Sequence, residues 1–433
     1  MGGIFEKLEN VLLPIASKIG NQRHMMAIRD AFSVIMPALI VGSLASLINN
    51  FPNEAFQAFM LNTFGEAWLI PGTFVYNMTM GILGLLVAIA LGYYLGKYYK
   101  LDGLSSAFIS GIAFLILSPV TADGAGIDIN WIGAKGLFLA MIVGILATEV
   151  FRFIVSRGWT IKMPAGVPPA VSDGFVALFP SIIVFVIAGL IAAVVSATTG
   201  GLSSSQLIYQ VLQSPFQSIG NTLPAVIILY VIRGGLWFLG IHGTNVMSPI
   251  TNSMLLPNME ANISAFTAGT AATDVPYIAT STFGDVFVSM GGTGVGLAFA
   301  IAVIIASRNK ASRSLAIGAA PAACFNINEP LMYGIPIVLN PIFLIPFLLA
   351  PIACIVIAWV AMSTGIVPKT VAMVPWNMPV IIGGYLATGA SISGALLQVV
   401  NLAVSVLIYF PFVKMNDRAV LREAEAETAE AAE

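Results

Sequence analysis

The sequence predicts an all-α membrane protein with about ten transmembrane helices, two re-entrant hairpins and amphipathic surface helices. Three observations lead to this prediction. Apolar residues make up 58% of the 433 residues and charged residues only 9%, whereas ordinary globular proteins carry about 25% charged residues. The charges gather near both ends of the chain and in short segments between long apolar runs. Several runs reach the roughly 20 residues that a helix needs to cross a bilayer.

The first segment, residues 1–30, is predicted to contain an amphipathic helix that lies on the membrane surface. Its apolar residues recur at helical spacing on one face: Ile4, Leu8, Val11, Ile15 and Ile19. Such a face suits the boundary between headgroups and lipid chains. Two glutamates at positions 6 and 9 argue against a cleaved signal peptide.

Six runs in the first 241 residues are long enough to span a membrane: 31–48, 70–96, 104–120, 131–151, 174–196 and 222–241. Lys and Arg precede the first run and follow the second and fourth. The alternate loops contain neither Lys nor Arg: 49–69, 121–130 and 197–221. Because cytoplasmic loops carry the excess of Lys and Arg, the N-terminus is predicted to lie in the cytoplasm.

The same charge rule predicts four further crossings in the second half. Basic residues between 308 and 313 mark a cytoplasmic loop after the run 286–307, and those from Lys414 onward mark a cytoplasmic C-terminus. The stretches 243–284 and 330–366 must then each cross once before the last run at 391–412. Ten crossings with both termini in the cytoplasm follow.

Prolines interrupt both of the long crossing stretches in this second half, the first at Pro249, Pro257 and Pro276 and the second at positions that include Pro330, Pro336, Pro341 and Pro346. Non-helical backbone survives at membrane depth only where protein covers it or where it lines a wet cavity. We therefore expect re-entrant hairpins around 243–270 and 314–335, of the kind that form substrate sites in transporters. Kinked but complete helices are the alternative.

Composition excludes several classes of function. A net charge of −2 with no basic cluster excludes nucleic acid as a partner, because phosphate binding needs a concentrated cationic surface. Only two cysteines and two histidines are present, so neither a disulfide framework nor a zinc site is predicted. No metal and no cofactor are expected.

Charged and titratable groups within membrane segments cost about 2.5–3.5 kcal/mol each on insertion scales, so each is a functional candidate. They are Glu149, Arg152, Arg233, His242, Asp274, Asp285 and Glu329. Glu149 and Arg152 are three residues apart, which favours a structural ion pair. Arg233 either pairs with an acid on another helix or lines the path of an anionic donor or product.

The densest polar cluster is Asn326-Ile327-Asn328-Glu329-Pro330. The proline disfavours α geometry at Glu329 and so places a carboxylate at a helix break. The carboxamides of Asn326 and Asn328 offer the directional hydrogen bonds that a neutral sugar requires, and Glu329 can accept a hydroxyl proton. The alternative is a cap that satisfies the broken helix.

A second candidate segment surrounds His242, which is followed by Gly243, Thr244 and Asn245. An imidazole can donate to or accept from a sugar hydroxyl near neutral pH, and the flanking glycines allow close backbone approach. A purely structural histidine is the competing interpretation.

Two weaker signals complete the candidate site. The glycine-rich stretch Gly291-Gly292-Thr293-Gly294 can offer backbone N–H groups to a phosphate, although glycines also serve helix packing. Trp237 and Trp376 are candidate stacking platforms for a sugar ring. Tryptophans also gather at membrane interfaces for other reasons.

Taken together, these segments resemble the membrane-embedded enzyme IIC of the bacterial phosphotransferase system, in its lactose, cellobiose and diacetylchitobiose family. The most specific motif is Phe325-Asn326-Ile327-Asn328-Glu329-Pro330 with the later Asn340-Pro341. The supporting motifs are Ala27-Ile28-Arg29-Asp30 after Arg23-His24, Gly166-Val167-Pro168-Pro169-Ala170-Val171, Gly240-Ile241-His242-Gly243, the 291–294 stretch, Gly334-Ile335-Pro336 and Tyr409-Phe410-Pro411-Phe412.

The resemblance implies a homodimer in the bacterial cytoplasmic membrane. Residues 31–200 would form a scaffold and dimerisation domain, 201–221 an amphipathic connector, 222–413 a sugar-transport domain that moves as an elevator, and 414–433 a cytoplasmic tail. The substrate would be a β-linked disaccharide of cellobiose, diacetylchitobiose or lactose type. The unusual segment from Trp376 to Pro379 leaves the sugar preference open.

The resemblance also implies a chemistry. His242 and Glu329 would meet the sugar 6-hydroxyl, with Glu329 as general base, and the donor would be a phosphocysteine on a separate cytoplasmic IIB protein that IIA supplies. An ion-coupled sugar transporter, with Asp274, Asp285 and Glu329 as proton carriers, is the main alternative. A purely structural membrane protein leaves the polar segments unexplained.

Overall fold

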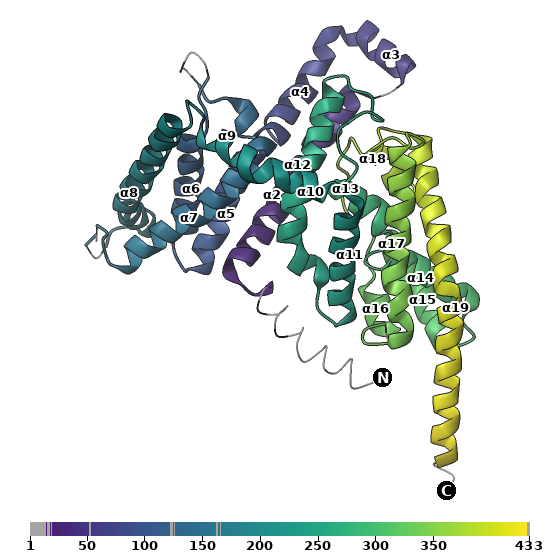
Figure 1. The fold of residues 1–433 in the computed structure, drawn as a ribbon. Helices are drawn as coiled ribbons and strands as arrows, with labels where there is room; N and C mark the ends of the chain where they lie inside the picture. Colours follow the sequence, from purple (N-terminus) through teal and green to yellow (C-terminus); the bar gives the residue numbers. More distant parts are fainter. Residues whose placement is uncertain are drawn as a thin grey trace.

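The computed structural model describes residues 14, 18, 20–51, 53–121, 124, 126–161, 163–164, 166–335 and 337–430. These residues form helices joined by loops (Figure 1), which confirms the all-α membrane fold class. Most of the predicted surface helix at 1–30 lies outside the described residues.

Residues 23–198, here called the first half, form a helical bundle. Its helices are α2 (Arg23–Asn49), α3 (Glu54–Phe64), α4 (Leu69–Asn77), α5 (Leu83–Tyr98), α6 (Gly103–Leu117), α7 (Leu137–Ser156) and α8 (Pro169–Thr198). The buried side chains of this bundle form one apolar core, which also takes in Leu256, Met259, Ile263 and Met373 from later in the chain. The first half is therefore packed as a unit and touches the second half along a limited surface.

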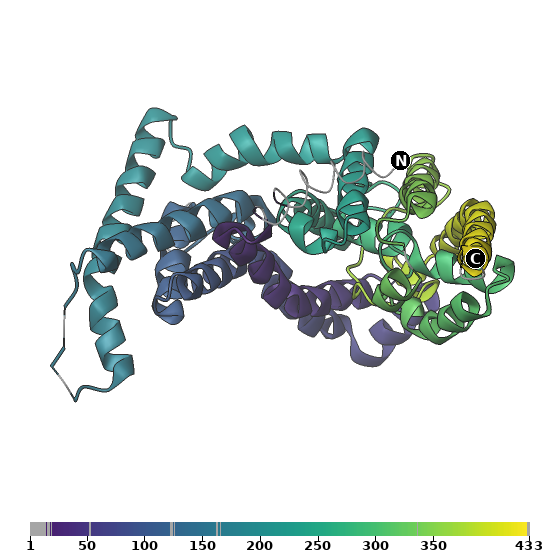
Figure 2. The same ribbon diagram turned by 90° about the horizontal axis from the view of Figure 1, so that it is seen from below.

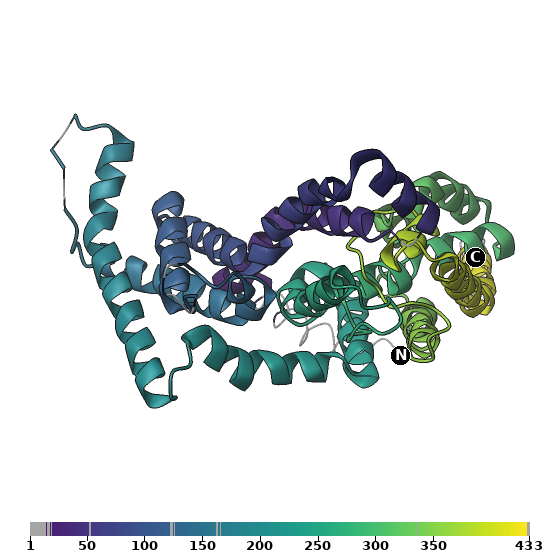
Figure 3. The same cartoon turned by 90° about the horizontal axis from the view of Figure 1, so that it is seen from above.

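A short helical arm connects the two halves. It consists of α9 (Ser204–Ile208), a π-helical turn η5 (Tyr209–Gln213) and α10 (Ser214–Gly220), and it meets the next helix at a bend of 80°. Ser203 and Gln206 form a capping box that begins the arm. The amphipathic connector predicted at 201–221 is thus helical, and it runs along one edge of the molecule in Figures 2 and 3.

Residues 223–430, here called the second half, contain the remaining elements. They are α11 (Leu223–Phe238), α12 (Gly243–Thr267), α13 (Ser281–Phe283), η6 (Gly284–Val288), α14 (Gly296–Ala306), α15 (Lys310–Cys324), α16 (Glu329–Gly334), α17 (Pro341–Ser363), α18 (Ile382–Ala387) and α19 (Ile392–Glu430). Two apolar cores are built entirely from residues of this half. Helices α2 and α12 lie where the halves meet (Figures 1 and 2).

Six helical segments among the described residues are long and apolar enough to cross a membrane: Arg23–Asn49, Glu66–Tyr98, Ala134–Ser156, Ser172–Thr198, Pro341–Ser363 and Ile392–Val420. The connector arm and α11 together would make a seventh, although sharply bent. Three predicted spans contain shorter helices: α6 has 15 residues, α11 has 16 and α14 has 11. The total of ten crossings therefore stays a prediction.

The hairpin predicted at 243–270 is wrong, because Gly243–Thr267 is one continuous helix, α12, with Pro249 and Pro257 inside it. A proline removes a backbone donor and leaves the carbonyl four residues earlier without its usual partner. For Pro249 that carbonyl belongs to Asn245, and the Ser248 hydroxyl donates to it at 3.2 Å. This local replacement helps the helix to tolerate its first proline.

Residues 314–335 fold as α15, a turn at 325–328 and α16, and their re-entry into the membrane stays a prediction. The span predicted at 286–307 is interrupted, because a non-helical turn at 289–295 separates η6 from α14. Gly291, Gly292 and Gly294 have φ values of +78°, +93° and +74°, which glycine adopts at little cost. The glycine-rich stretch thus breaks the helix instead of packing inside it.

Candidate functional site

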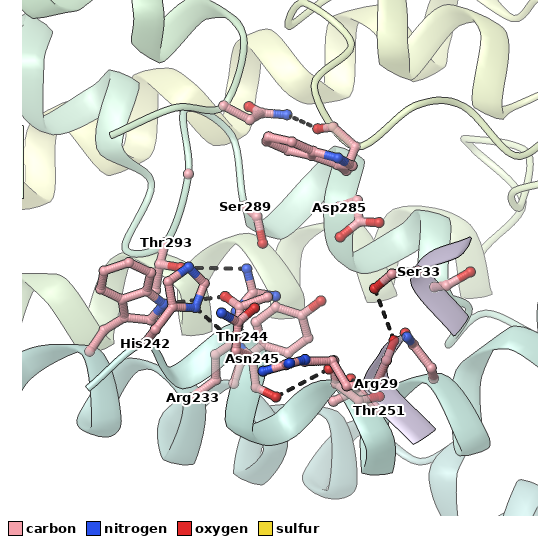
Figure 4. Close-up of a pocket in the computed structure, with 18 of the residues that line it drawn as sticks. Arg29, Ser33, Arg233, His242, Thr244, Asn245, Thr251, Asp285, Ser289 and Thr293 are labelled. Atoms are coloured by element: carbon pink, nitrogen blue, oxygen red, sulfur yellow. Dashed lines mark hydrogen bonds between the residues drawn. The ribbon is translucent and has the colours of Figure 1, made fainter. Parts of the chain in front are cut away.

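A cavity of about 410 Å³ lies between the two halves, close to α2 and α12 (Figure 4). Its volume is in the range of about 300–1,000 Å³ that is typical of small-molecule sites. One wall comes from α2. The other walls come from α11, α12, the segment around η6, the turns near 292 and 328, and Trp376.

The cavity brings together eleven of the thirteen residues predicted from the sequence: Arg233, Trp237, His242, Thr244, Asn245, Gly292, Thr293, Asn326, Asn328, Glu329 and Trp376. They come from segments up to 143 positions apart in the chain. These residues therefore come together only when the second half is folded.

His242 precedes α12 and caps its N-terminus. Its Nδ1 atom accepts a hydrogen bond from the Asn245 backbone N–H at 3.2 Å, so in the neutral ring the proton lies on Nε2. The imidazole lies against the Trp237 ring with centroids 4.4 Å apart. Trp237 is only 3% exposed, and its indole N–H donates to the Thr244 hydroxyl at 3.2 Å. These contacts fix the ring of His242 and leave its Nε2–H available to a ligand.

Glu329 is the first residue of α16, at the end of the turn from α15. Pro330 follows it at the start of the helix, where the missing proline N–H costs nothing because it would have no helical partner. The Glu329 side chain is exposed and lines the cavity. A solvent-accessible carboxylate on a rigid turn is suited to accept a proton from a bound hydroxyl.

The two asparagines of this turn hold neighbouring segments in place. Asn326 has φ +63°; its side chain accepts from the Gly291 N–H at 2.6 Å and donates to the Trp376 carbonyl. Asn328 is buried and donates to the Thr293 carbonyl at 2.8 Å. A Cβ on Gly292 would lie 2.4 Å from the Asn328 side-chain oxygen, so only glycine fits there. The asparagines therefore shape the cavity as well as lining it.

Arg233 places a guanidinium group among these polar residues. Its Nη2 atom donates to the Thr293 hydroxyl at 3.4 Å, and its Cζ atom lies 5.2 Å from the centre of the Tyr230 ring. The Nε atom is buried and has no hydrogen-bond partner in the described part of the chain. A buried donor without a partner is costly unless a ligand satisfies it.

Two of the predicted site residues, Gly243 and Gly294, do not line the cavity. Each of them permits a close packing contact instead. A Cβ on Gly243 would lie 2.1 Å from the Arg233 carbonyl oxygen, and a Cβ on Gly294 would lie 2.2 Å from the Phe347 ring. Gly294 also accepts a hydrogen bond from the buried Tyr409 hydroxyl at 2.5 Å. Both glycines permit close contacts within the second half.

The sequence analysis missed a polar stripe of α12 that lines the cavity beyond Asn245: Ser248, Thr251 and Asn252. Small polar residues at spacings of three and four were the available signal, but the prolines led to a hairpin prediction instead. Ser281, Asp285 and Ser289 line the cavity from the segment around η6. Of these, only Asp285 was a candidate, as a proton carrier in the ion-coupled alternative.

The wall from α2 was also missed. Arg29, Ser33 and Met36 lie at helical spacing on one side of α2 and line the cavity. Figure 4 shows Arg29 extending from this helix toward the residues of α11 and α12, on the side of the cavity opposite His242. No local pattern could predict this, because it depends on how the two halves meet.

The predicted pair of Glu149 and Arg152 is confirmed, with 2.8 Å between carboxylate and guanidinium. Glu149 also contacts His24 Nε2 at 2.9 Å and accepts a hydrogen bond from the Tyr99 hydroxyl. Burial, reinforced by the hydrogen bond to Glu149, raises the pKa of Tyr99. This cluster joins α2, α5 and α7 away from the cavity.

Comparison with known proteins places the chain in a family. The family model described as "Phosphotransferase system, EIIC" matches residues 29–351. The chain is 38% identical to the lichenan permease IIC component of Bacillus subtilis (strain 168), over 98% of this chain and 96% of that protein. It is 36% identical to the cellobiose-specific EIIC component of Geobacillus stearothermophilus, over 99% and 97% of the two chains.

A solved structure agrees with these sequence matches. The crystal structure of the transporter ChbC, the IIC component of an N,N'-diacetylchitobiose-specific phosphotransferase system, superposes with a TM-score of 0.91 and 35% identity. The match covers 96% of this chain and 99% of that chain. The chain therefore belongs to the EIIC family of sugar permeases of the phosphotransferase system.

Proposed function

We propose that this permease takes up a β-linked disaccharide, passes it to a phosphorylated IIB protein for transfer to the 6-hydroxyl, and releases the sugar phosphate into the cytoplasm. The relatives named for lichenan, cellobiose and N,N'-diacetylchitobiose all point to β-linked saccharides. The observation that carries the proposal is that His242, Glu329 and the partnerless Nε of Arg233 line one cavity in the described part of the chain.

Each of these three residues has a chemical role in the proposed transfer. Glu329 removes the proton from the attacking sugar hydroxyl, whose oxygen bonds to phosphorus while the bond from phosphorus to the IIB cysteine sulfur breaks and a thiolate leaves. His242 orients the sugar through its Nε2–H. Arg233 stabilises the charge on the transferred group. Such transfers depend mainly on positioning and electrostatics.

The sugar rings need apolar faces as well as hydrogen bonds. Trp376 is 54% exposed and lines the cavity, while its backbone is held by Asn326. An exposed indole at the wall of a cavity is suited to pack against a pyranose ring. The hydroxyl and amide groups of α12 then remain for the ring hydroxyls.

Basic residues support a cytoplasmic position for both termini. Tyr98 and Tyr99 at the end of α5 bond to Asp30 and Glu149, so Lys97, Lys100 and Arg157 lie near the same end of the molecule as the start of α2. Helix α2 begins and α19 ends on the lower side of Figure 1. By the positive-inside rule this side faces the cytoplasm, which is where IIB and IIA act.

The two halves suit a scaffold and a moving transport domain, at 31–200 and 222–413. Apart from apolar packing, few hydrogen bonds between described residues join them. The Ser43 hydroxyl accepts from the Met373 N–H at 2.6 Å, and the Ser46 and Thr267 hydroxyls are 2.5 Å apart. Together with the bent connector, this limited contact favours an elevator motion of the second half against the first.

Helix α8 offers the surface for a homodimer. It carries a row of exposed apolar side chains one turn apart: Ile182, Val186, Leu190 and Val194. An apolar groove of about 370 Å³ runs between α8 and the neighbouring helices α6 and α7. A second copy of the first half would cover this surface, in keeping with the dimerisation role proposed for residues 31–200.

The decisive experiment uses proteoliposomes with labelled cellobiose, diacetylchitobiose or lactose outside. Phosphorylated IIB is enclosed in one set of vesicles and unphosphorylated IIB in the other. We expect sugar phosphate in the lumen only with phosphorylated IIB, and the preferred sugar identifies the substrate. Unmodified sugar that accumulates on a proton gradient without phosphorylated IIB would establish the ion-coupled transporter instead.

A further inference from the structure

We infer that Arg29 of α2 supplies a second cation to the phosphoryl-transfer site, and that Asp30 and Tyr98 position it. The inference rests on the proposed function and adds to it a charged residue from the first half. Apart from Arg29, Ser33 and Met36, the residues that line the cavity lie at position 230 or later. Arg29 is therefore the charged group that the described part of the first half contributes.

The arginine is held by a short chain of hydrogen bonds. Its Nε atom donates to the Asp30 carboxylate at 2.8 Å. The other oxygen of that carboxylate accepts a hydrogen bond from the Tyr98 hydroxyl, at the end of α5. The hydrogen bond to Asp30 is made by Nε, so the Nη groups keep N–H donors for a ligand. Arginine Nη groups bind phosphate oxygens in pairs, which a lysine cannot reproduce.

The charges of the cavity fit a phosphoryl group better than a neutral sugar. Among the described residues that line it, Arg29 and Arg233 are the permanent cations, and Asp285 and Glu329 carry the carboxyl groups. When Glu329 takes up the hydroxyl proton it becomes neutral, so the cavity gains net positive charge at the moment when the phosphoryl group arrives. A phosphate monoester carries about −1.5 to −2 near pH 7. Two guanidinium groups then face the product.

Because Arg29 belongs to the first half, it can couple phosphoryl transfer to the position of the second half. A phosphoryl group bound by Arg29 and Arg233 touches both halves at once, so transfer requires the arrangement in which the cavity lies beside the first turns of α2. If the second half moves away from that position, the sugar moves with it and is no longer close to Arg29. Phosphorylation is thereby confined to the conformation that faces the donor.

The test compares Arg29→Gln and Arg29→Lys with Arg152→Gln as a matched control. Arg152 is also an ion-paired arginine of the first half, but it lies outside the cavity. Three quantities are measured on the full-length protein: the single-turnover rate of transfer from phosphorylated IIB, the Kd of the sugar and the Kd of its 6-phosphate.

We expect Arg29→Gln to lower the transfer rate by roughly 100-fold or more, as for loss of one preorganised donor to a transition state. The Kd of the 6-phosphate should rise about tenfold, whereas the Kd of the neutral sugar should change by less than about twofold. Arg29→Lys should recover only part of the rate, and Arg152→Gln should resemble the wild type. Transfer by Arg29→Gln at the wild-type rate would overturn the inference, as would equal losses for sugar and sugar phosphate. Absence of transfer by the wild type would instead contradict the proposed function.

The positioning role of Tyr98 is tested with a matched pair of variants. Tyr98→Phe removes the hydroxyl that holds Asp30, and Tyr99→Phe removes the neighbouring hydroxyl that holds Glu149. Tyr98→Phe should lower the transfer rate several-fold with an unchanged sugar Kd, and Tyr99→Phe should leave both unchanged. Equal effects of the two variants would reduce Tyr98 to a structural role.

Discussion

The side-chain amide of Asn326 donates to the backbone carbonyl of Trp376, across 50 positions of sequence. This bond ties the turn that carries Glu329 to the loop that carries an exposed indole. The same amide side chain accepts from the Gly291 N–H. One residue therefore sets the relative positions of three segments that line the cavity.

Two substitutions of Asn326 distinguish the contributions of these two hydrogen bonds. Asn326→Asp keeps an acceptor for Gly291 but loses the donor to Trp376, whereas Asn326→Gly relieves the positive φ and removes both bonds. The bond to Trp376 is exposed and the bond from Gly291 is partly buried, so each contributes about 0.5–1.5 kcal/mol. We expect sugar affinity to fall by up to about tenfold in Asn326→Asp and by more in Asn326→Gly. Titration of the purified protein by calorimetry measures it; wild-type affinity for Asn326→Asp would show that the Trp376 bond does not shape the site.

Glu329→Gln is expected to bind the sugar with nearly wild-type affinity and to lose phosphoryl transfer by about 10²–10⁴-fold, the usual contribution of a general base. Glutamine keeps the shape and hydrogen-bonding reach of the side chain but cannot take up the proton. Single-turnover assays with phosphorylated IIB give the rate. Normal turnover in this variant would remove Glu329 from the role of base.

His242 combines a cap with a ligand-facing N–H, and two substitutions distinguish them. An asparagine side chain can still cap α12, so His242→Asn should retain thermal stability and lose sugar affinity. His242→Ala should lose both, with about 0.5–2 kcal/mol of stability lost with the cap. Thermal unfolding in detergent and sugar titration are measured together. Unchanged sugar affinity in His242→Asn would leave only the capping role.

Gly294→Ala is expected to destabilise the second half without any direct loss of a sugar contact. The new Cβ would lie 2.2 Å from the Phe347 ring at a backbone φ of +74°. The double variant with Phe347→Leu should recover only part of the loss, because the backbone strain remains. Melting temperatures of the wild type, both single variants and the double variant complete the cycle; full recovery would show that strain at Gly294 is negligible.

Local chemistry made most of the site predictable. Asn326, Asn328 and Glu329 stand in one short polar run in an apolar chain, and His242 stands between glycines at a helix end, so residue type and spacing were enough to select them. Arg29 could not be selected in this way. It resembles an ordinary basic residue before a membrane span, and its position in the cavity depends on the packing of α2 against the second half.

The errors in the fold have a common cause. Pro249 was treated as a break and the glycines at 291–294 as part of a continuous span, whereas α12 continues through Pro249 with help from the Ser248 hydroxyl and the glycines do interrupt a helix. A helix can continue through a proline when a nearby donor bonds to the carbonyl that the proline leaves without its usual partner. For the glycines, the deciding factors are the positive φ values and the bonds from Asn326 and Asn328.

The hydrogen bonds of Ser43 and Ser46 across the two halves are uncharged. Bonds of this kind contribute only about 0.5–1.5 kcal/mol each to a folded structure, and water or a hydroxyl one turn away can replace them. The ion pairs between described side chains all lie within the first half, so the halves can exchange partners without separating any of them. In the proposed elevator motion, the second half therefore exchanges apolar contacts and hydrogen bonds with the first, among them the bond from the Tyr76 hydroxyl to Glu260 at 3.5 Å, and breaks no ion pair of the described residues.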